Sequence, residues 1–224
     1  MDIDIPITLR ARLTLGLLVI VAGASLFAAL ASQLGEGQLM RDADQAINEA
    51  MRTGVPQGVH EIFAALTHLA DPATLTALCV AVTLALGARR RFALASGWVF
   101  AVAGNGLLNE TLKSLFGRDR PLPVDGASLV DGFSFPSGHS SGAVVAYGML
   151  AYLGLRLLAP RWHLPALAAA GVLAVLVGLS RLVLGVHFAS DVIAGFASGT
   201  AWLALSVTGI ELARWRGSSR GLGS

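Results

Sequence analysis

The sequence predicts an all-α, polytopic membrane protein, built as a bundle of six transmembrane helices with a short amphipathic helix between the first two. Three observations predict this fold class. Of the 224 residues, 54% are apolar and only 13% are charged, whereas a soluble domain usually carries about 25% charged residues. The mean hydropathy is +0.68. Finally, six apolar stretches approach the length of a membrane-spanning helix.

Each stretch is judged against a hydrocarbon core of about 30 Å, which takes roughly 20 helical residues to cross. The predicted spans are residues 13–34, 59–86, 92–116, 139–158, 164–184 and 188–210. The last three are dense in Leu, Val and Ala and contain glycines that let helices approach closely. Because the spans share one bundle, residues 1–224 are predicted to form a single domain.

The segment between the first two spans has the pattern of an amphipathic helix. Its apolar residues recur at helical spacing, and its acidic residues lie opposite: Leu39, Ala43, Ile47, Ala50 and Met51 against Asp42, Asp44 and Glu49. This pattern favours a helix lying at the membrane interface. We expect the helix to pack against the bundle, and a role in gating substrate is the alternative.

The arginines indicate the orientation of the spans. If the spans alternate, ten arginines fall on one side of the membrane: Arg10, Arg12, Arg89, Arg90, Arg91, Arg156, Arg161, Arg214, Arg216 and Arg220. The positive-inside rule makes that side cytoplasmic, so both termini are predicted to be cytoplasmic. A cleaved signal peptide ending near Ala31 is the alternative interpretation of the first span.

Charge and cysteine content exclude two further classes. The net charge is +2 and the arginines form no basic stripe, so nucleic-acid binding is not expected. Cys79 is the single cysteine and lies in an apolar stretch, which excludes an internal disulfide and predicts a buried, inert thiol.

Three segments at the predicted outer ends of spans concentrate residues suited to phosphate chemistry, namely residues 113–121, 135–140 and 180–191. They supply three cations, enough to neutralise a phosphate dianion: Lys113, Arg120 and Arg181. Lys113 is the single lysine beside fifteen arginines, and its place at a motif position favours a function over chance.

The second and third segments predict an anion site and a nucleophile. Ser137 and Gly138 precede the expected start of the fourth span, where free backbone N–H groups attract an anion. His187 and Asp191 are four residues apart and share a helix face. Asp191 is predicted to bind Nδ1 of His187, which leaves Nε2 to attack phosphorus. His139 is predicted to act as general acid and then as base for water.

The alternative, structural interpretation is that a single histidine at the end of a span only packs against its neighbours or anchors the helix at the interface. Here eleven motif residues occur together, in order, on one predicted face, which favours catalysis. No cluster of His, Asp and Glu has the spacing of a metal site, so we predict a reaction without a metal or other cofactor.

These segments read K-x6-R-P, P-S-G-H and S-R-x5-H-x3-D, and over about residues 66–210 the chain resembles the type 2 phosphatidic-acid phosphatase superfamily. Its six-span layout looks like the bacterial lipid phosphatases of that superfamily. The resemblance implies that phosphate is bound by Lys113, Arg120, Ser137, Gly138 and Arg181. It also implies that His139 is the general acid, that His187 is the nucleophile and that Asp191 orients it.

The combined expectation is a membrane lipid phosphatase that forms a phosphohistidine intermediate. Phosphatidylglycerol phosphate, undecaprenyl pyrophosphate and phosphatidic acid all fit as substrates. The alternatives are a lipid phosphotransferase and a non-catalytic lipid-phosphate-binding or transport protein. The expected location is a bacterial inner membrane with the site facing the periplasm, and the oligomeric state is open.

The motifs do not assign a role to several neighbouring residues. Glu110 pairs with Lys113 or extends outward. Arg118 and Asp119 are expected to form a solvated pair rather than to join the site. The group His60, His68 and Asp71 is expected to cap a helix and anchor it at the interface. The irregular loop 122–135 is a hypothetical lid over the phosphate.

Overall fold

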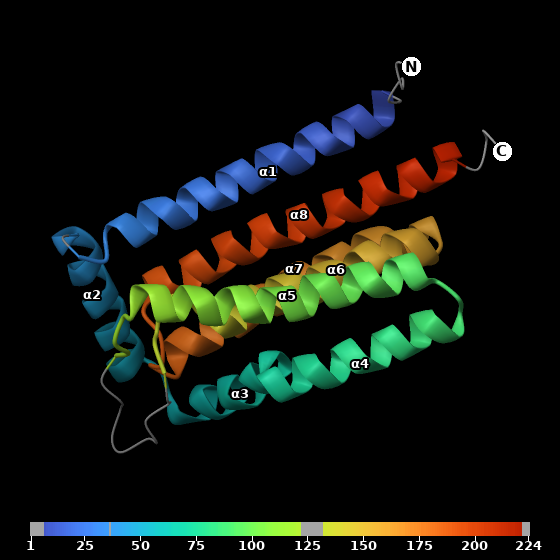
Figure 1. Cartoon of the computed structure of the whole chain (residues 1–224). Coiled ribbons are helices and arrows are strands. Elements are labelled where there is room, and N and C mark those ends of the chain that lie inside the picture. The colour runs from blue at the N-terminus through green and yellow to red at the C-terminus, as the bar shows by residue number, and fades with distance from the viewer. Residues whose placement is uncertain (1–6, 36, 122–131, 221–224) are drawn as a thin grey trace.

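The computed structural model describes residues 7–35, 37–121 and 132–220, and within them it contains helices and no β-strand. The elements are α1 (Ile7–Ser32), α2 (Gln38–Gly54), α3 (Gln57–Thr67), α4 (Pro72–Ala88), α5 (Phe92–Phe116), α6 (Gly138–Leu157), α7 (His163–Val183) and α8 (Ala189–Arg220), with short 3₁₀ helices η1 (His68–Ala70) and η2 (Pro160–Trp162). The long helices lie side by side, and α2 lies across the end of the bundle opposite both termini (Figure 1). The all-α prediction is confirmed.

The predicted count of six spans is not confirmed. In the part of the chain described, four helices are long and apolar enough to cross a membrane: Ile7–Ser32, Phe92–Phe116, Pro160–Val183 and Ala189–Gly217. A bent pair, Gln57–Ala70 with Pro72–Ala88, makes a fifth if it counts as one span. Helix α6 covers the predicted span 139–158 but is not among them.

Helix α6 has a physical reason to be less apolar than a typical span. It packs against α5, α7 and α8, and Ser140, Ser141 and Gly142 in its first turns are buried. A helix surrounded by other helices meets small side chains rather than lipid, so it needs no lipophilic surface. Its hydropathy is therefore lowered by the same residues that let its neighbours approach.

The predicted span 59–86 is broken rather than continuous. Asp71 has an extended backbone with φ −60° and ψ 146°, and the two halves are bent by 43°. Pro72 explains the break, since a residue before proline is pushed out of the α region. Proline also lacks an N–H but suits the first position of a new helix, where α4 begins.

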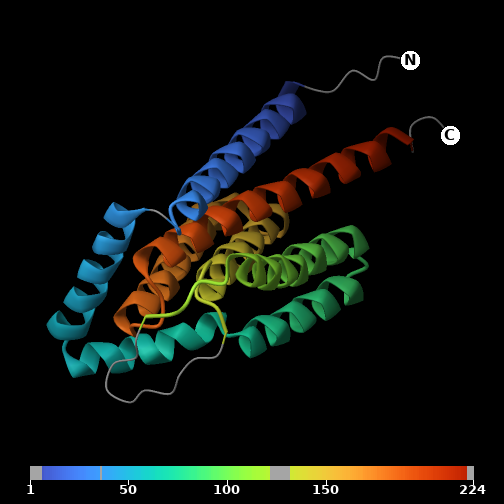
Figure 2. The same cartoon turned by 60° about the vertical axis from the view of Figure 1, so that its left-hand side comes forward.

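Helix α2 occupies the segment predicted to be amphipathic, and Figure 2 shows it against the end of the bundle. Its apolar side chains face outward, with Leu39 85% exposed, whereas Asp44 is only 3% exposed. Asp44 therefore meets the protein, whereas the other two acidic residues of the helix, Asp42 and Glu49, are exposed.

Two glycines of α8 bring this helix against the start of α6. A Cβ at position 195 would lie 2.6 Å from the carbonyl oxygen of Ser137, and one at position 199 would lie 2.9 Å from the Cα of Ser141. Side chains at either position would force the helices apart. The close approach of Gly195 and Gly199 fixes the first turn of α8 beside the first turn of α6.

Candidate active site

The three motifs converge at the end of the bundle that carries α2 (Figure 1). Lys113 lies in the last turn of α5, and Arg181 in the last turn of α7. A cavity of about 780 Å³ is lined by six of the eight predicted site residues: Lys113, Arg120, Gly138, His139, Arg181 and His187. The remaining two, Ser137 and Asp191, are fully buried behind it.

His187 lies in the turn before α8 and is 2% exposed. Its Nε2 is 3.1 Å from Nη1 of Arg120. Because a guanidinium can only donate, Nε2 accepts and carries the lone pair, and the ring proton is on Nδ1. Nδ1 lies 3.3 Å from Oγ of Ser134 and 3.4 Å from Oδ2 of Asp191. The ring is therefore held in the tautomer that a nucleophilic Nε2 requires.

The pKa of His187 is lowered to about 4, chiefly because burial disfavours the charged ring, although Asp191 opposes this shift. At neutral pH the imidazole is therefore uncharged. A neutral ring keeps a lone pair that is available for nucleophilic attack.

Asp191 is saturated with hydrogen bonds, as a buried carboxylate must be. Its Oδ2 accepts from the backbone N–H of Phe188 at 2.9 Å and from the hydroxyl of Ser134. Its Oδ1 accepts from Nη1 of Arg118 at 2.6 Å. The expected contact with His187 is the longest of these bonds, so Asp191 orients the ring together with Ser134.

Arg118 joins the site, and the expectation of a solvated pair with Asp119 is wrong. Its guanidinium donates to Asp191, to Oγ of Ser190 at 2.7 Å and to Oδ2 of Asp44 at 2.8 Å. It also stacks over the ring of Phe188, 4.3 Å from the centroid. Asp44 in turn accepts from the backbone N–H of Ser190 at 2.9 Å.

Asp44 therefore ties the interfacial helix α2 to the first turn of α8. The sequence pattern places Asp44 on the acidic face of the helix and does not predict this contact. A signal was present, because Asp44 lies on a face opposite apolar residues, but its partners are distant in the chain.

His139, in the first turn of α6, has a second carboxylate partner. Its Nε2 is 2.8 Å from Oδ1 of Asp71, and Oδ2 of Asp71 is 2.5 Å from Nδ1 of His68. The interpretation of Asp71 as a cap and interface anchor is therefore incomplete. An acid immediately before a proline, inside a predicted span, was the signal in the sequence.

The start of α6 is shaped to receive an anion. Ser137 is the N-cap and accepts from the N–H of Ser140 at 3.4 Å. A Cβ at position 138 would lie 2.9 Å from Oδ1 of Asn109 and 3.9 Å from Nζ of Lys113. Glycine is needed there because a side chain would fill the space between the helix start and the cation.

Arg181 is 6% exposed, and its Nη1 donates to the hydroxyl of Thr67. Its Nε is buried without a hydrogen-bond partner among the residues described. An unpaired buried donor is costly, and an anion in the cavity would supply the acceptor. Lys113 lies 3.7 Å from Glu110, which extends outward with its side chain 76% exposed.

The cavity continues from the cations into an apolar region between α4 and α5. This part is lined by Leu75, Thr76, Cys79, Val80, Val102, Ala103, Gly106 and Leu107. Cys79 is half-buried rather than enclosed. Residues 122–131 of the hypothetical lid lie outside the described part of the chain.

Comparisons with known proteins identify the family of the chain. The family model described as the PAP2 superfamily matches residues 94–215. The chain is 36% identical over 170 residues to phosphatidylglycerophosphatase B of Bacillus subtilis, covering 71% of this chain and 79% of that protein. It is 38% identical over 126 residues to a lipid A 1-phosphatase of Rhizobium johnstonii, covering 51% and 46% respectively.

A solved structure has a similar fold. The crystal structure of a transmembrane PAP2-type phosphatidylglycerolphosphate phosphatase from Bacillus subtilis superimposes with a TM-score of 0.74 at 34% identity. The match covers 83% of this chain and 94% of that one.

Proposed function

The chain belongs to the PAP2 superfamily and is a membrane lipid phosphatase, and we propose that it works through a phosphohistidine formed on His187. The observation that carries this proposal is the orientation of His187. Its Nε2 lone pair is held by Arg120 beside a cavity that is also lined by His139, Lys113 and Arg181. A site that only bound an anion would need the cations but not a buried, neutral imidazole.

Two displacements complete the reaction. In the first, Nε2 of His187 attacks phosphorus, the bond from phosphorus to the lipid oxygen breaks, and His139 gives its proton to that oxygen. In the second, His139 takes a proton from water while the water oxygen attacks the phosphohistidine, and the P–N bond breaks. Lys113, Arg120 and Arg181 stabilise the charge on the phosphoryl oxygens in both steps.

Phosphate binding is assigned to five residues. Lys113, Arg120 and Arg181 supply positive charge, and Ser137 and Gly138 bring the N–H groups of α6 to the phosphate. Asp191 acts on the nucleophile only through its orientation. We propose a reaction without a metal, since these cations neutralise a phosphate dianion by themselves.

The apolar region between α4 and α5 supports a substrate with lipid tails. The phosphate would enter among the cations while a tail stays between the two helices, open to the bilayer. Of the compatible substrates, phosphatidylglycerol phosphate comes first, because the Bacillus subtilis relative that is 36% identical over 71% of this chain is named for it. Lipid A 1-phosphate, undecaprenyl pyrophosphate and phosphatidic acid follow.

We also propose that α6 crosses the membrane, which gives six spans with the α3–α4 pair as one. The arginine distribution would then put both termini in the cytoplasm and the site at the periplasmic face of a bacterial inner membrane. The length of α8 supports this arrangement. Asp191 and Glu211 are 20 residues apart on one helix, about 30 Å at 1.5 Å per residue, which matches the hydrocarbon core.

The test is phosphate release by purified protein in detergent, with a chelator present, from a panel of these four lipids. We expect release by the wild type, inhibition by vanadate, and no release by His187→Ala. The control is His60→Ala, a histidine that does not line the cavity. Undiminished release by His187→Ala would reject this nucleophile. A phosphorylated acceptor lipid in place of free phosphate would indicate a transferase, and no reaction with any lipid would indicate a binding protein.

A further inference from the structure

Asp71 contacts two histidines through its carboxylate. Its two oxygens bind the catalytic His139 at 2.8 Å and the more exposed His68 at 2.5 Å. We infer that Asp71 is a positioning residue for His139, one that holds this imidazole as a proton donor toward the departing lipid oxygen. This inference rests on the proposed function of His139.

The break in the second span is what brings Asp71 to the site. Asp71 has an extended backbone at the 43° bend between α3 and α4. The chain changes direction there, and the carboxylate reaches His139 at the start of α6. A second contact holds the same segment against α6, because the hydroxyl of Tyr147 donates to the carbonyl of Leu69 at 2.8 Å. Tyr147 is two turns beyond His139, so η1 is bound to α6 at two levels.

The charges around His139 explain why a carboxylate is needed. The charged groups that face the ring are Arg181 from α7, Lys113 from α5 and Asp71. Burial of the ring disfavours a protonated imidazole most, the two cations disfavour it further, and Asp71 favours it. A general acid must hold a proton before it can donate one, and Asp71 is the group that acts in this direction against burial and against the cations that phosphate binding requires.

Asp71 keeps its own charge throughout the cycle. The proton that His139 gives to the leaving oxygen in the first displacement is replaced from water in the second, so no proton has to pass through the carboxylate. Because Nε2 of His139 is bound to Asp71, Nδ1 is the ring nitrogen that would donate to the departing oxygen. His68 completes the arrangement by binding the second carboxylate oxygen.

The test compares leaving groups in the variant Asp71→Asn. An alkyl phosphate such as phosphatidylglycerol phosphate needs protonation of its departing oxygen, whereas the oxygen of 4-nitrophenyl phosphate is weakly basic and leaves without it. General acid catalysis contributes about 10²- to 10⁴-fold. We expect Asp71→Asn to lose about 10- to 100-fold in kcat on the lipid and less than about 3-fold on the aryl phosphate. The alkaline limb of the lipid pH profile should move to lower pH.

The controls separate this inference from the proposed function. His187→Ala should lose both substrates, and Asp119→Asn, which changes an exposed acid, should lose neither. Equal losses of Asp71→Asn on both substrates, or a lipid pH profile that does not move, would overturn the role of Asp71 while leaving His187 as nucleophile. If wild-type protein hydrolyses neither substrate, both proposals fail.

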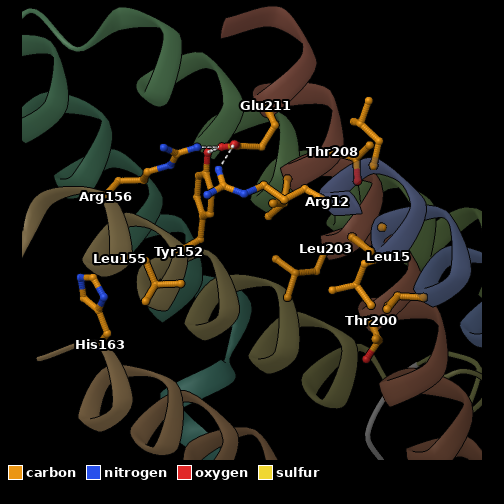
Figure 3. Close-up of a pocket in the computed structure, with 15 residues that line it drawn as sticks. Arg12, Leu15, Tyr152, Leu155, Arg156, His163, Thr200, Leu203, Thr208 and Glu211 are labelled. Atoms are coloured by element: carbon orange, nitrogen blue, oxygen red, sulfur yellow. Dashed lines mark hydrogen bonds and ion pairs between the residues drawn. The ribbon is translucent and has the colours of Figure 1, made fainter. Parts of the chain in front are cut away.

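A second, independent observation lies at the opposite end of the bundle. Glu211 of α8 accepts hydrogen bonds from Arg12 of α1 at 3.2 Å, from the hydroxyl of Tyr152 at 2.6 Å and from Arg156 of α6. The side chain of Glu211 is 10% exposed. Figure 3 shows the two guanidinium groups meeting this carboxylate from opposite sides at the edge of a cavity.

That cavity has a volume of about 630 Å³ and is lined by α1, α6, α7 and α8. Beyond the charged cluster its walls are mainly apolar, with Leu15, Val19, Leu203 and Val207 among them. The space exists because α1 lies along α8 rather than along α6 or α7 (Figure 1). The size is within the range of about 300 to 1,000 Å³ typical of small-molecule sites.

The charge of the cluster identifies the class of ligand. Two guanidinium groups and one carboxylate leave a net charge of +1, which complements the single negative charge of a phosphodiester. The Arg12 side chain is 64% exposed, so it has donors available beside Glu211. We propose that this cavity binds one anionic phospholipid, with its phosphodiester at Arg12 and Arg156 and an acyl chain along the apolar walls.

Native mass spectrometry of protein reconstituted in equal parts of phosphatidylglycerol and phosphatidylcholine tests this site. We expect one retained phosphatidylglycerol in the presence of vanadate, and loss of that preference in Arg12→Gln. Leu203→Phe, which fills the cavity without changing charge, should also lose it, and Arg89→Gln should keep it. Equal retention of both lipids, or an unchanged preference in both cavity variants, would mean annular lipid only and would overturn the proposal.

Discussion

Replacement of Arg118 by glutamine is expected to destabilise the protein more than any exposed arginine replacement. Arg118 joins two buried carboxylates, Asp44 and Asp191, which are 3% and 0% exposed in their side chains. Arg118→Gln would leave both without their cation. Breaking a buried ion pair from one side costs about 3–5 kcal/mol.

The lower end of that range is appropriate because the Arg118 side chain is itself 14% exposed. A loss of about 3 kcal/mol corresponds to a decrease in Tm of roughly 6 to 12 °C for a chain of this size. Thermal unfolding in detergent, followed by tryptophan fluorescence, measures it. The control is Arg52→Gln, which removes an exposed pair with Glu49 and should cost less than about 1 kcal/mol.

The double variant Asp44→Asn/Arg118→Gln tests the reason for the loss. If the cost comes from an unpaired carboxylate, removing one of the two carboxylates should recover stability, with a coupling of about 1–3 kcal/mol. Additive losses, or an Arg118→Gln variant as stable as Arg52→Gln, would refute the view that this guanidinium links Asp44 of α2 to Asp191 of α8.

Three further outcomes are expected. Gly195→Ala should lower kcat by at least about 10-fold, because the new Cβ would lie 2.6 Å from the carbonyl oxygen of Ser137 at the start of α6. The control Gly209→Ala, whose Cβ would have no atom within 4 Å, should keep its activity. Equal activities of the two variants would show that α8 can shift freely. His187 should titrate near pH 4 by ¹⁵N NMR, because burial lowers its pKa. Between pH 6.5 and 4 only the unfolded chain binds this proton, so the free energy of unfolding falls as the pH falls. A titration midpoint near pH 6.5 would contradict the burial of the ring. Glu110 lines the cavity, but it lies 3.7 Å from Lys113 and its side chain is 76% exposed. Glu110→Gln should therefore change KM by less than about 2-fold. A larger change in phosphate-release assays would show that Glu110 contributes to substrate binding.

The motif residues were predictable from the sequence because local patterns encode them. The spacing of His187 and Asp191 is a helix spacing, and the cations lie at span ends where apolar stretches stop. The spans of α5, α7 and α8 were predictable for the same reason, since lipid imposes a hydropathy that a window of sequence can detect.

The supporting residues were not predictable in this way. Asp44 meets Ser190 across 146 positions and Asp71 meets His139 across 68, and no local pattern encodes such a contact. The break at Pro72 was readable in principle from the residue preference before proline. The status of α6 was harder to judge, because a helix enclosed by other helices loses the hydropathy that marks a span.

Trapping the covalent intermediate tests the central claim most directly. Protein mixed with a ³²P-labelled lipid phosphate would be quenched in alkali, where phosphohistidine survives, digested and examined by mass spectrometry. We expect an alkali-stable, acid-labile phosphate on the peptide that contains His187, and none in His187→Gln. Label on a different residue, or phosphate release that continues in His187→Gln without any labelled protein, would contradict the mechanism.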